Sequence, residues 1–385
     1  MSSRKSETPL RLLRPVPAFL LLALLAACSD EIVTPVEVHV PSITGLSYTS
    51  FTADGFTTGG QNGAVRDLKS QTGSEWVSLN VFEFQTSDTS SDIGPNTTGR
   101  NPLTGAVWST SSTEADLREG VRQARLSNLK IMLKPTIDLY SGEWRANIRP
   151  DTAGRWFRAY TAWILRFAGI ANELNVEMLC VGTELITATQ PQFTGAWHDI
   201  VDSIRHHYRG KLTYASNWNG LAEAGINEPE FQQVQFWNSL DFIGIDSYYP
   251  LTVSAEEAVP SLATGESRMA GAVHAMAAVA QSAGKPIILT ETGIQSVRGA
   301  LASPWDYSRG ASPGATVDTT AQAYYYRVMI GAIGGQSWCE GMFWWNWESV
   351  PTSYAATNYT PRNKPAAGVL RAWYAEPVAA MAENR

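Results

Sequence analysis

Cysteine and histidine are scarce in this 385-residue chain, which holds three Cys and five His. Three cysteines cannot build the disulfide framework that holds small secreted domains together. Cys180 lies inside an apolar run, so we expect it to be a buried thiol. None of the histidines lies at the end of a short apolar run of the kind expected to form a strand, where a strand-end metal site would hold its ligands. We therefore expect no metal and no cofactor.

A surplus of positive charge is also missing. Lys and Arg total 29 against 36 Asp and Glu, which gives a formal net charge of −7. An acidic surface repels phosphate backbones, so we expect no nucleic-acid partner. The chain also lacks the Gly-rich loops that bind dinucleotides and nucleoside triphosphates, and the G-x-S-x-G elbow of α/β-hydrolases. These absences exclude several large classes of enzyme.

A short apolar run stands near the N-terminus. Ala18–Ala27 has ten residues, follows four basic side chains and leads directly into Cys28. A membrane-spanning helix needs about 20 apolar residues, whereas the core of a signal peptide needs about 7–15. Leu25-Ala26-Ala27-Cys28 resembles a bacterial lipobox, in which the cysteine thiol receives the lipid. The alternative is an ordinary secretory signal with an incidental cysteine.

This N-terminal pattern predicts the organisation of the chain. We expect a lipoprotein signal peptide over residues 1–27, a tether over 28–41 and one catalytic domain over 42–385. Lipidation of Cys28 would anchor the protein to a membrane outside the cytoplasm. Ser29, rather than Asp, follows the cysteine and favours the outer membrane.

From residue 43 onward, short apolar runs alternate with longer segments of helical period. The runs expected as strands are 43–51, 75–85, 130–139, 176–185, 211–217, 240–249, 286–293 and 341–348. The segments expected as helices include 113–127, 155–174, 193–208, 266–283 and 319–336. Continuous apolar runs are typical of strands that are covered on both faces. The pattern predicts a single-domain α/β fold, a (β/α)8 TIM barrel. An open doubly wound sheet is the alternative, and the missing dinucleotide motif weakens it.

Two of the expected strands end in a single glutamate. Glu184 closes the fourth strand and Glu291 closes the seventh. The carboxyl ends of the strands form the active-site face of a TIM barrel. An unpaired carboxylate at the end of an apolar strand is costly, and a facing pair is what retaining glycoside hydrolysis uses. The alternative is that each glutamate caps or pairs locally.

The sequence resembles Glycoside Hydrolase Family 113, a clan A barrel family known for endo-β-1,4-mannanases. The matching segments are LKP (133–135), VGTEL (181–185), IGIDSYYPL (243–251), PIILTETG (286–293) with Pro304-Trp305 after it, and FWWNW (343–347). The resemblance implies that Glu184 is the acid/base, that Glu291 is the nucleophile and that β-1,4-mannan is the leading substrate. Thr136 stands where the family often has a histidine.

Other polar and aromatic residues near expected strand ends are candidates for substrate binding. They are Lys134, Asn217, Trp218, Asp246, Tyr248, Trp305, Trp345 and Trp347. Tryptophan offers a flat face to a pyranose ring, and asparagine offers both a donor and an acceptor to hydroxyls. Strand alternation places Trp345 and Trp347 on one side, and we expect one of the pair to line the subsite where the bond breaks. Tyr248 could also hold the nucleophile or be an ordinary rim aromatic, and Lys134 could tune a glutamate or form an ion pair. The strand tryptophans could instead pack against helices.

These patterns together predict a retaining glycoside hydrolase that acts on a β-linked polysaccharide or oligosaccharide. One alternative keeps the mechanism and changes the substrate to a glucan or a xylan. Another is a non-catalytic glycan-binding surface lipoprotein that has kept the barrel. Retention of both Glu184 and Glu291 argues against the second alternative.

Overall fold

The structure is a computed structural model that describes residues 41–375. The expected signal peptide, the lipidation site at Cys28 and all of the tether except residue 41 lie outside the described residues. Eight parallel strands form a closed barrel, in which β1 pairs with both β2 and β9. The strands are β1 (Ile43–Thr49), β2 (Trp76–Gln85), β4 (Lys130–Leu139), β5 (Met178–Thr183), β6 (Lys211–Asn217), β7 (Phe242–Ser247), β8 (Ile287–Thr292) and β9 (Cys339–Glu348). The predicted TIM barrel is confirmed, and closure excludes an open sheet.

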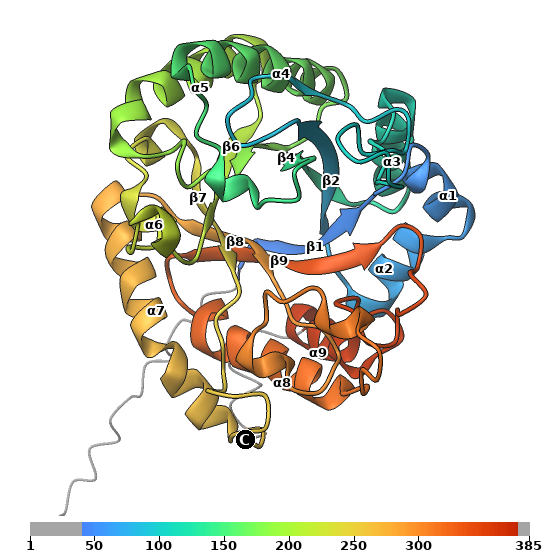
Figure 1. Ribbon diagram of the computed structural model, residues 1–385. Coiled ribbons are helices and arrows are strands. Elements are labelled where there is room, and N and C mark those ends of the chain that lie inside the picture. Colours follow the sequence, from blue (N-terminus) through green and yellow to red (C-terminus); the bar gives the residue numbers. More distant parts are fainter. Residues whose placement is uncertain (1–40, 376–385) are drawn as a thin grey trace, which may run out of the picture. The chain divides into compact units, whose positions relative to one another are not determined.

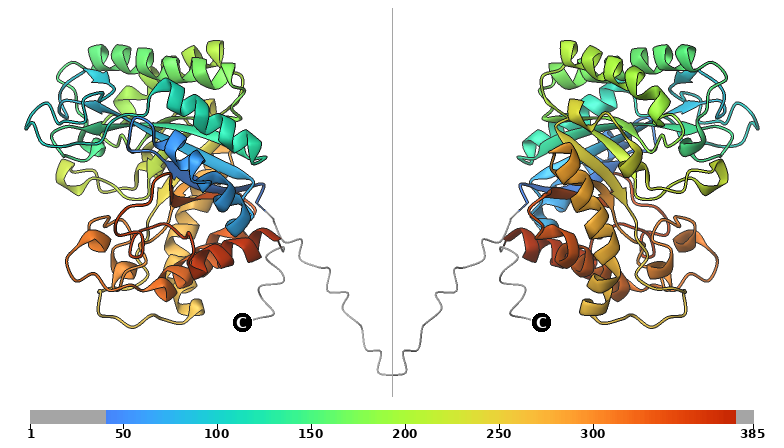
Figure 2. Two further views of the ribbon diagram at one scale, coloured as in Figure 1. Left: turned by 90° about the vertical axis from the view of Figure 1, so that its right-hand side faces the viewer. Right: turned by 90° about the vertical axis from the view of Figure 1, so that its left-hand side faces the viewer.

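Helices cover the outside of the barrel, as Figures 1 and 2 show. They are α1 (Gly55–Gln61), α2 (Ala64–Thr72), α3 (Glu114–Leu126), α4 (Ala153–Glu173), α5 (Thr194–His207), α6 (Glu230–Gln233), α7 (Leu262–Ala283), α8 (Thr319–Met329) and α9 (Pro365–Ala375). The five expected helices are present, although α8 gives way to a π-helical turn over Ile330–Gly334. A short antiparallel strand, β3 (Ile93–Gly94), pairs with the end of β2.

The start of α3 illustrates how the sequence determines a helix end. The Thr113 side chain caps the helix by accepting a hydrogen bond from the Asp116 N–H at 3.1 Å. The Asp116 carboxylate does not complete a capping box. It accepts hydrogen bonds from the N–H groups of Phe56 and Thr57 instead, at 3.2 and 2.8 Å. Asp116 therefore ties α3 to α1.

The apolar core has two layers. The inner layer fills the barrel and draws on almost every strand, with Ile43, Trp76, Met132, Met178, Cys180, Ala215, Ile288 and Phe343. The outer layer lies between the strands and the helices, where the apolar stripe of α4 is buried, including Trp156, Tyr160 and Trp163. Cys180 and Cys339 are both buried and form no disulfide.

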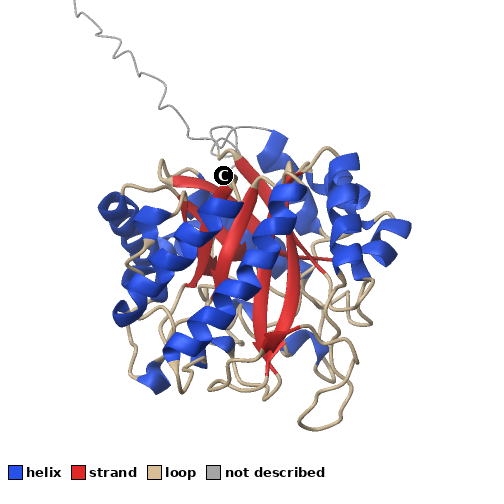
Figure 3. Cartoon of the chain, turned by 90° about the horizontal axis from the view of Figure 1, so that it is seen from above, coloured by secondary structure: helices blue, strands red, loops and turns tan. Residues whose placement is uncertain are grey.

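Register irregularities interrupt three strands near the carboxyl ends that form the active-site face. β5 has an extra residue relative to β6 just before Glu184, and β8 has one relative to β7 just before Glu291. β9 has an extra residue relative to β1 between Trp344 and Trp347. Such bulges re-aim the side chains that follow them. Figure 3 shows the strands enclosed by helices, with much of the loop structure gathered at one end.

Two kinds of feature are absent from residues 41–375. No helix in this part of the chain has the length and apolar character needed to cross a bilayer. The same residues contain no group of three or more His, Cys, Asp or Glu side chains that could hold a metal ion.

Candidate active site

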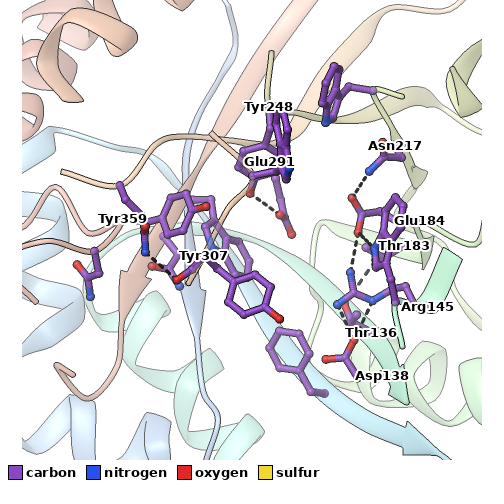
Figure 4. A pocket seen from close by; sticks show the side chains of 18 of the residues that line it. Thr136, Asp138, Arg145, Thr183, Glu184, Asn217, Tyr248, Glu291, Tyr307 and Tyr359 are labelled. Atoms are coloured by element: carbon purple, nitrogen blue, oxygen red, sulfur yellow. Dashed lines mark hydrogen bonds and ion pairs between the residues drawn. The ribbon is translucent and has the colours of Figure 1, made fainter. Parts of the chain in front are cut away.

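A cleft of about 670 Å³ opens at the carboxyl ends of the strands. Its walls include Phe51, Phe82, Thr136, Asp138, Trp144, Arg145, Thr183, Glu184, Asn217, Trp218, Tyr248, Glu291, Gln295, Trp305, Tyr307, Trp345, Glu348, Tyr354 and Tyr359. The long loop after β8, residues 294–318, contributes three of them, whereas residues 86–112 after β2 contribute none. Figure 4 shows the carboxylates of Glu184 and Glu291 on facing sides of this space.

Both carboxylate oxygens of Glu291 receive a hydrogen bond. Glu291 lies in β8, immediately after the bulge. Lys134 Nζ lies 2.6 Å from Oε1, and the Tyr248 hydroxyl donates to Oε2 at 2.7 Å. The glutamate side chain is 13% exposed, so it reaches the cleft while its partners hold it from behind. This arrangement fixes the orientation of the Glu291 carboxylate.

Lys134 lies in β4 and is completely buried beneath the cleft. Its ammonium group also contacts both oxygens of Asp246 in β7, at 3.0 and 3.1 Å. Thr290 donates a further hydrogen bond to Asp246 at 2.7 Å. Burial alone would lower the pKa of Lys134, but the charges of Asp246 and Glu291 raise it above its ordinary value. Lys134 is therefore the cation that compensates two buried carboxylates.

Glu184 follows β5 and is held by three donors. The Asn217 side chain, at the end of β6, donates to Oε1 at 2.5 Å. Arg145 lies 2.6 Å from Oε2, and the Trp144 indole donates to the same oxygen at 3.2 Å. Glu184 has a left-handed backbone with φ of 51°, a conformation that few residues other than glycine adopt. Its side chain is 10% exposed and lines the cleft.

Arg145 and Trp144 are functional candidates that the sequence analysis missed. They come from the loop after β4, where a 3-10 turn spans Arg145–Asn147. Arg145 also pairs with Asp138 at 2.6 Å, so one guanidinium joins two acids at the cleft wall. Burial would lower the pKa of Arg145, but Asp138 and Glu184 raise it above its ordinary value. A Trp-Arg pair in a loop of mixed composition has no periodic pattern that would have revealed this contact.

Aromatic side chains line the cleft on several sides. Trp218 and Trp305 pack together with ring centroids 5.4 Å apart, and Trp305 remains 48% exposed. Trp345 of β9 is partly exposed and also faces the cleft. Flat aromatic faces of this kind suit the apolar faces of sugar rings.

Three of the residues predicted to bind substrate do not line the cleft. Lys134 and Asp246 lie beneath it and act through Glu291. Trp347 is fully buried, so the interpretation of this residue as a sugar-stacking side chain does not fit the structure. The β9 bulge is the reason: Trp344 and Trp347 pair with Leu46 and Tyr48, which lie on one side of β1, while Trp345 turns to the cleft.

Known proteins share the sequence profile and the fold of this chain. The sequence profile of Glycoside Hydrolase Family 113 matches residues 47–363. A solved structure of a complex of a β-1,4-mannanase of that family is 24% identical, with a TM-score of 0.68 over 87% of this chain and 99% of the other. A β-mannanase from Alicyclobacillus acidocaldarius, in complex with ManMIm, is also 24% identical, with a TM-score of 0.70 over 86% and 97% of the two chains.

More distant structures share the barrel as well. A β-glucuronidase from Ruminococcus gnavus is 13% identical, with a TM-score of 0.54 over 86% of this chain and 49% of the other. A search of curated protein sequences found no match. The structural likenesses establish the fold, and the profile match covers most of the chain. The protein therefore belongs to Glycoside Hydrolase Family 113 and is a glycoside hydrolase.

Proposed function

We propose that this glycoside hydrolase cleaves β-1,4-mannan with retention of anomeric configuration, using Glu291 as the nucleophile and Glu184 as the acid/base. The observation that carries the roles is the different surroundings of the two carboxylates. Lys134 and Tyr248 hold Glu291 from beneath through contacts of 2.6 and 2.7 Å, which orients its carboxylate toward the cleft as an attacking group. Glu184 lies on the facing wall of the same cleft, where a leaving group could meet it.

In the first step, a Glu291 oxygen forms a bond to the anomeric carbon while the glycosidic C–O bond breaks. Glu184 gives its proton to the departing oxygen. In the second step, Glu184 takes a proton from water, the water oxygen bonds to the anomeric carbon, and Glu291 leaves as a carboxylate. Arg145 lies 2.6 Å from the Glu184 carboxylate and keeps it in place between the two steps.

The choice of mannan is supported by the solved structures that share the fold, three of which bear the name of β-mannanases. The aromatic walls of the cleft suit a polysaccharide in general. The test is incubation of the purified protein with mannan, β-glucan and xylan, followed by chromatography of the products. Release of manno-oligosaccharides is expected. If products form from glucan or xylan alone, the substrate is that polysaccharide and not mannan. Binding without any products would favour a glycan-binding protein.

The stereochemical outcome tests the mechanism separately. Proton NMR during early hydrolysis should show the β-anomer of the new reducing end before mutarotation. If the α-anomer appears first, the two glutamates do not carry out a double displacement.

We also propose that the protein is a lipoprotein anchored through Cys28, outside the cytoplasm and at the outer membrane. The support is the apolar run that ends at Cys28 and the Ser29 that follows it. Metabolic labelling with an alkyne-tagged fatty acid should mark the wild-type protein in the outer-membrane fraction and leave a Cys28→Ala variant unlabelled. Equal labelling of both proteins, or of neither, would contradict the proposal.

A further inference from the structure

Glu184 has another carboxylate behind it, that of Glu230. Glu230 begins α6, has no exposed surface and is absent from the walls of the cleft. Tyr214 and Thr189 donate hydrogen bonds to its Oε1 at 2.6 and 2.8 Å, and the Asn217 N–H donates to Oε2 at 2.7 Å. Three donors therefore converge on one acid that the mechanism does not use.

Two of these donors lead to Glu184. The Tyr214 hydroxyl also accepts a hydrogen bond from the Leu185 N–H at 2.7 Å, one residue beyond Glu184. The Asn217 side chain donates to the Glu184 carboxylate at 2.5 Å. Glu230 is thus linked to the backbone next to Glu184 through Tyr214, and to the Glu184 carboxylate through Asn217.

The backbone of Glu184 needs this support. A left-handed conformation at a residue other than glycine costs about 1 kcal/mol or more and persists only where the surroundings hold it. The Glu184 N–H donates to the Ala215 carbonyl at 2.8 Å, and the Leu185 N–H is held by Tyr214. Gly182 allows Tyr214 to approach, because a Cβ at that position would lie 2.8 Å from the tyrosine ring.

We propose that Glu230 is a positioning residue for the acid/base Glu184, which rests on the function proposed above. Glu230 does not touch the substrate. It holds Tyr214 and Asn217 so that both the backbone and the carboxylate of Glu184 are fixed toward the cleft. All three partners approach as donors, so the three contacts are complete when the Glu230 carboxyl is ionised, above its pKa of about 7. A glutamine has one oxygen and one NH2 group, so at least one of the three contacts is lost whichever way the amide turns.

The test compares substrates whose leaving groups differ in their need for a proton. A Glu230→Gln variant should lower kcat/KM for a manno-oligosaccharide by about tenfold or more, because the departing sugar needs the acid. The same variant should lower kcat/KM for dinitrophenyl β-mannoside by less than about threefold, because that leaving group departs without a proton. A lesion that merely loosens the fold would reduce both values by the same factor.

Two further variants make the comparison specific. Glu83→Gln is the matched control, because Glu83 is also a buried acid but pairs with Trp163 and Arg166 on the far side of β2. It should change kcat/KM for both substrates equally. Tyr214→Phe removes the hydroxyl between Glu230 and Leu185. It should also lower kcat/KM much more for the manno-oligosaccharide than for dinitrophenyl β-mannoside, and it provides the test if Glu230→Gln fails to fold. The double variant Glu230→Gln/Tyr214→Phe should then lose less kcat/KM for the manno-oligosaccharide than the product of the two single losses.

The outcomes separate this inference from the proposed function. In one outcome, the loss of kcat/KM in Glu184→Ala depends strongly on the leaving group, whereas Glu230→Gln and Tyr214→Phe lower kcat/KM for both substrates equally or not at all. The inference is then overturned, and the acid/base assignment stands. If Glu184→Ala itself shows no such dependence, the acid/base assignment fails and the inference fails with it.

Discussion

Lys134 Nζ lies 2.6 Å from Glu291 Oε1, and the same ammonium group lies 3.0 Å from Asp246. The lysine side chain has no exposed surface, although Glu291 reaches the cleft. One buried cation therefore serves the proposed nucleophile and a structural acid at once. The charge balance of the barrel interior and the activity of the site are coupled through this residue.

Replacing Lys134 with methionine should lower both stability and activity. The change leaves two carboxylates buried without a cation, and breaking a buried pair in this way costs about 3–5 kcal/mol. The loss of unfolding free energy relative to the wild type should become smaller as the pH falls, because the carboxylates can then take up protons. Denaturant unfolding at several pH values, together with kcat measurements, checks both effects. Asp246→Asn is the control: an amide oxygen can still accept from Lys134 and Thr290, so this variant should lose less stability than Lys134→Met.

Tyr248→Phe should reduce turnover with little effect on the fold. Burial and the charge of Glu291 raise the pKa of Tyr248 well above its ordinary value, so the hydroxyl remains a donor to Glu291 throughout the working pH range. A hydrogen bond to a charged group is worth about 1.5–3 kcal/mol, which corresponds to a loss of about 10–100-fold in kcat/KM. Steady-state kinetics measure this loss. Tyr249→Phe is the neighbouring control, because its hydroxyl makes only a 3.4 Å contact with the Trp218 carbonyl, and an equal loss there would contradict the assignment.

Trp345 and Trp347 should respond differently to replacement by alanine. Trp345 lines the cleft, so its loss should raise KM for mannan, by about tenfold if the ring contributes about 1.4 kcal/mol of binding. Trp347 is fully buried, so its loss should cost about 3–5 kcal/mol of stability. Thermal unfolding and kinetics on both variants separate the two roles. If the Trp347→Ala variant has wild-type stability but a raised KM for mannan, Trp347 contacts the substrate and its assignment to the core is wrong.

Glu230 should make stability depend on pH. Burial raises its pKa from 4.5 to about 7 in the folded protein, even though Tyr214, Asn217 and Thr189 donate to it. Between these pH values the folded protein keeps a proton that the unfolded chain has released. The free energy of unfolding should therefore fall as the pH rises through this range, by up to about 3 kcal/mol. Glu230→Gln removes this contribution, so its curve of unfolding free energy against pH should be flatter than that of the wild type; parallel curves would contradict it.

The barrel and its two strand-end glutamates were accessible from the sequence for a physical reason. Strands covered on both faces are continuous apolar runs, so an acid such as Glu184 or Glu291 at the end of one stands out. The apolar stripe of α4 was equally plain, because a helix that packs on a barrel must bury one face.

Other parts of the site depend on contacts that no periodic pattern records. Arg145 reaches Glu184 from a loop, and Glu230 reaches Tyr214 from a four-residue helix. Trp347 was assigned to the cleft by strict alternation, which the bulge in β9 breaks. A bulge depends on how two strands pair, and one strand's sequence does not contain that information.

The most direct test of the account is to trap the covalent intermediate. The wild-type protein is incubated with a 2-deoxy-2-fluoro-β-mannoside that carries a dinitrophenyl leaving group, digested, and examined by peptide mass spectrometry. The fluorine slows both steps, and the good leaving group allows the first to proceed, so a glycosyl-enzyme should accumulate. The fluorosugar should be attached to the peptide that contains Glu291, at that side chain. Attachment at any other residue, or release of dinitrophenol with no labelled peptide, would contradict it.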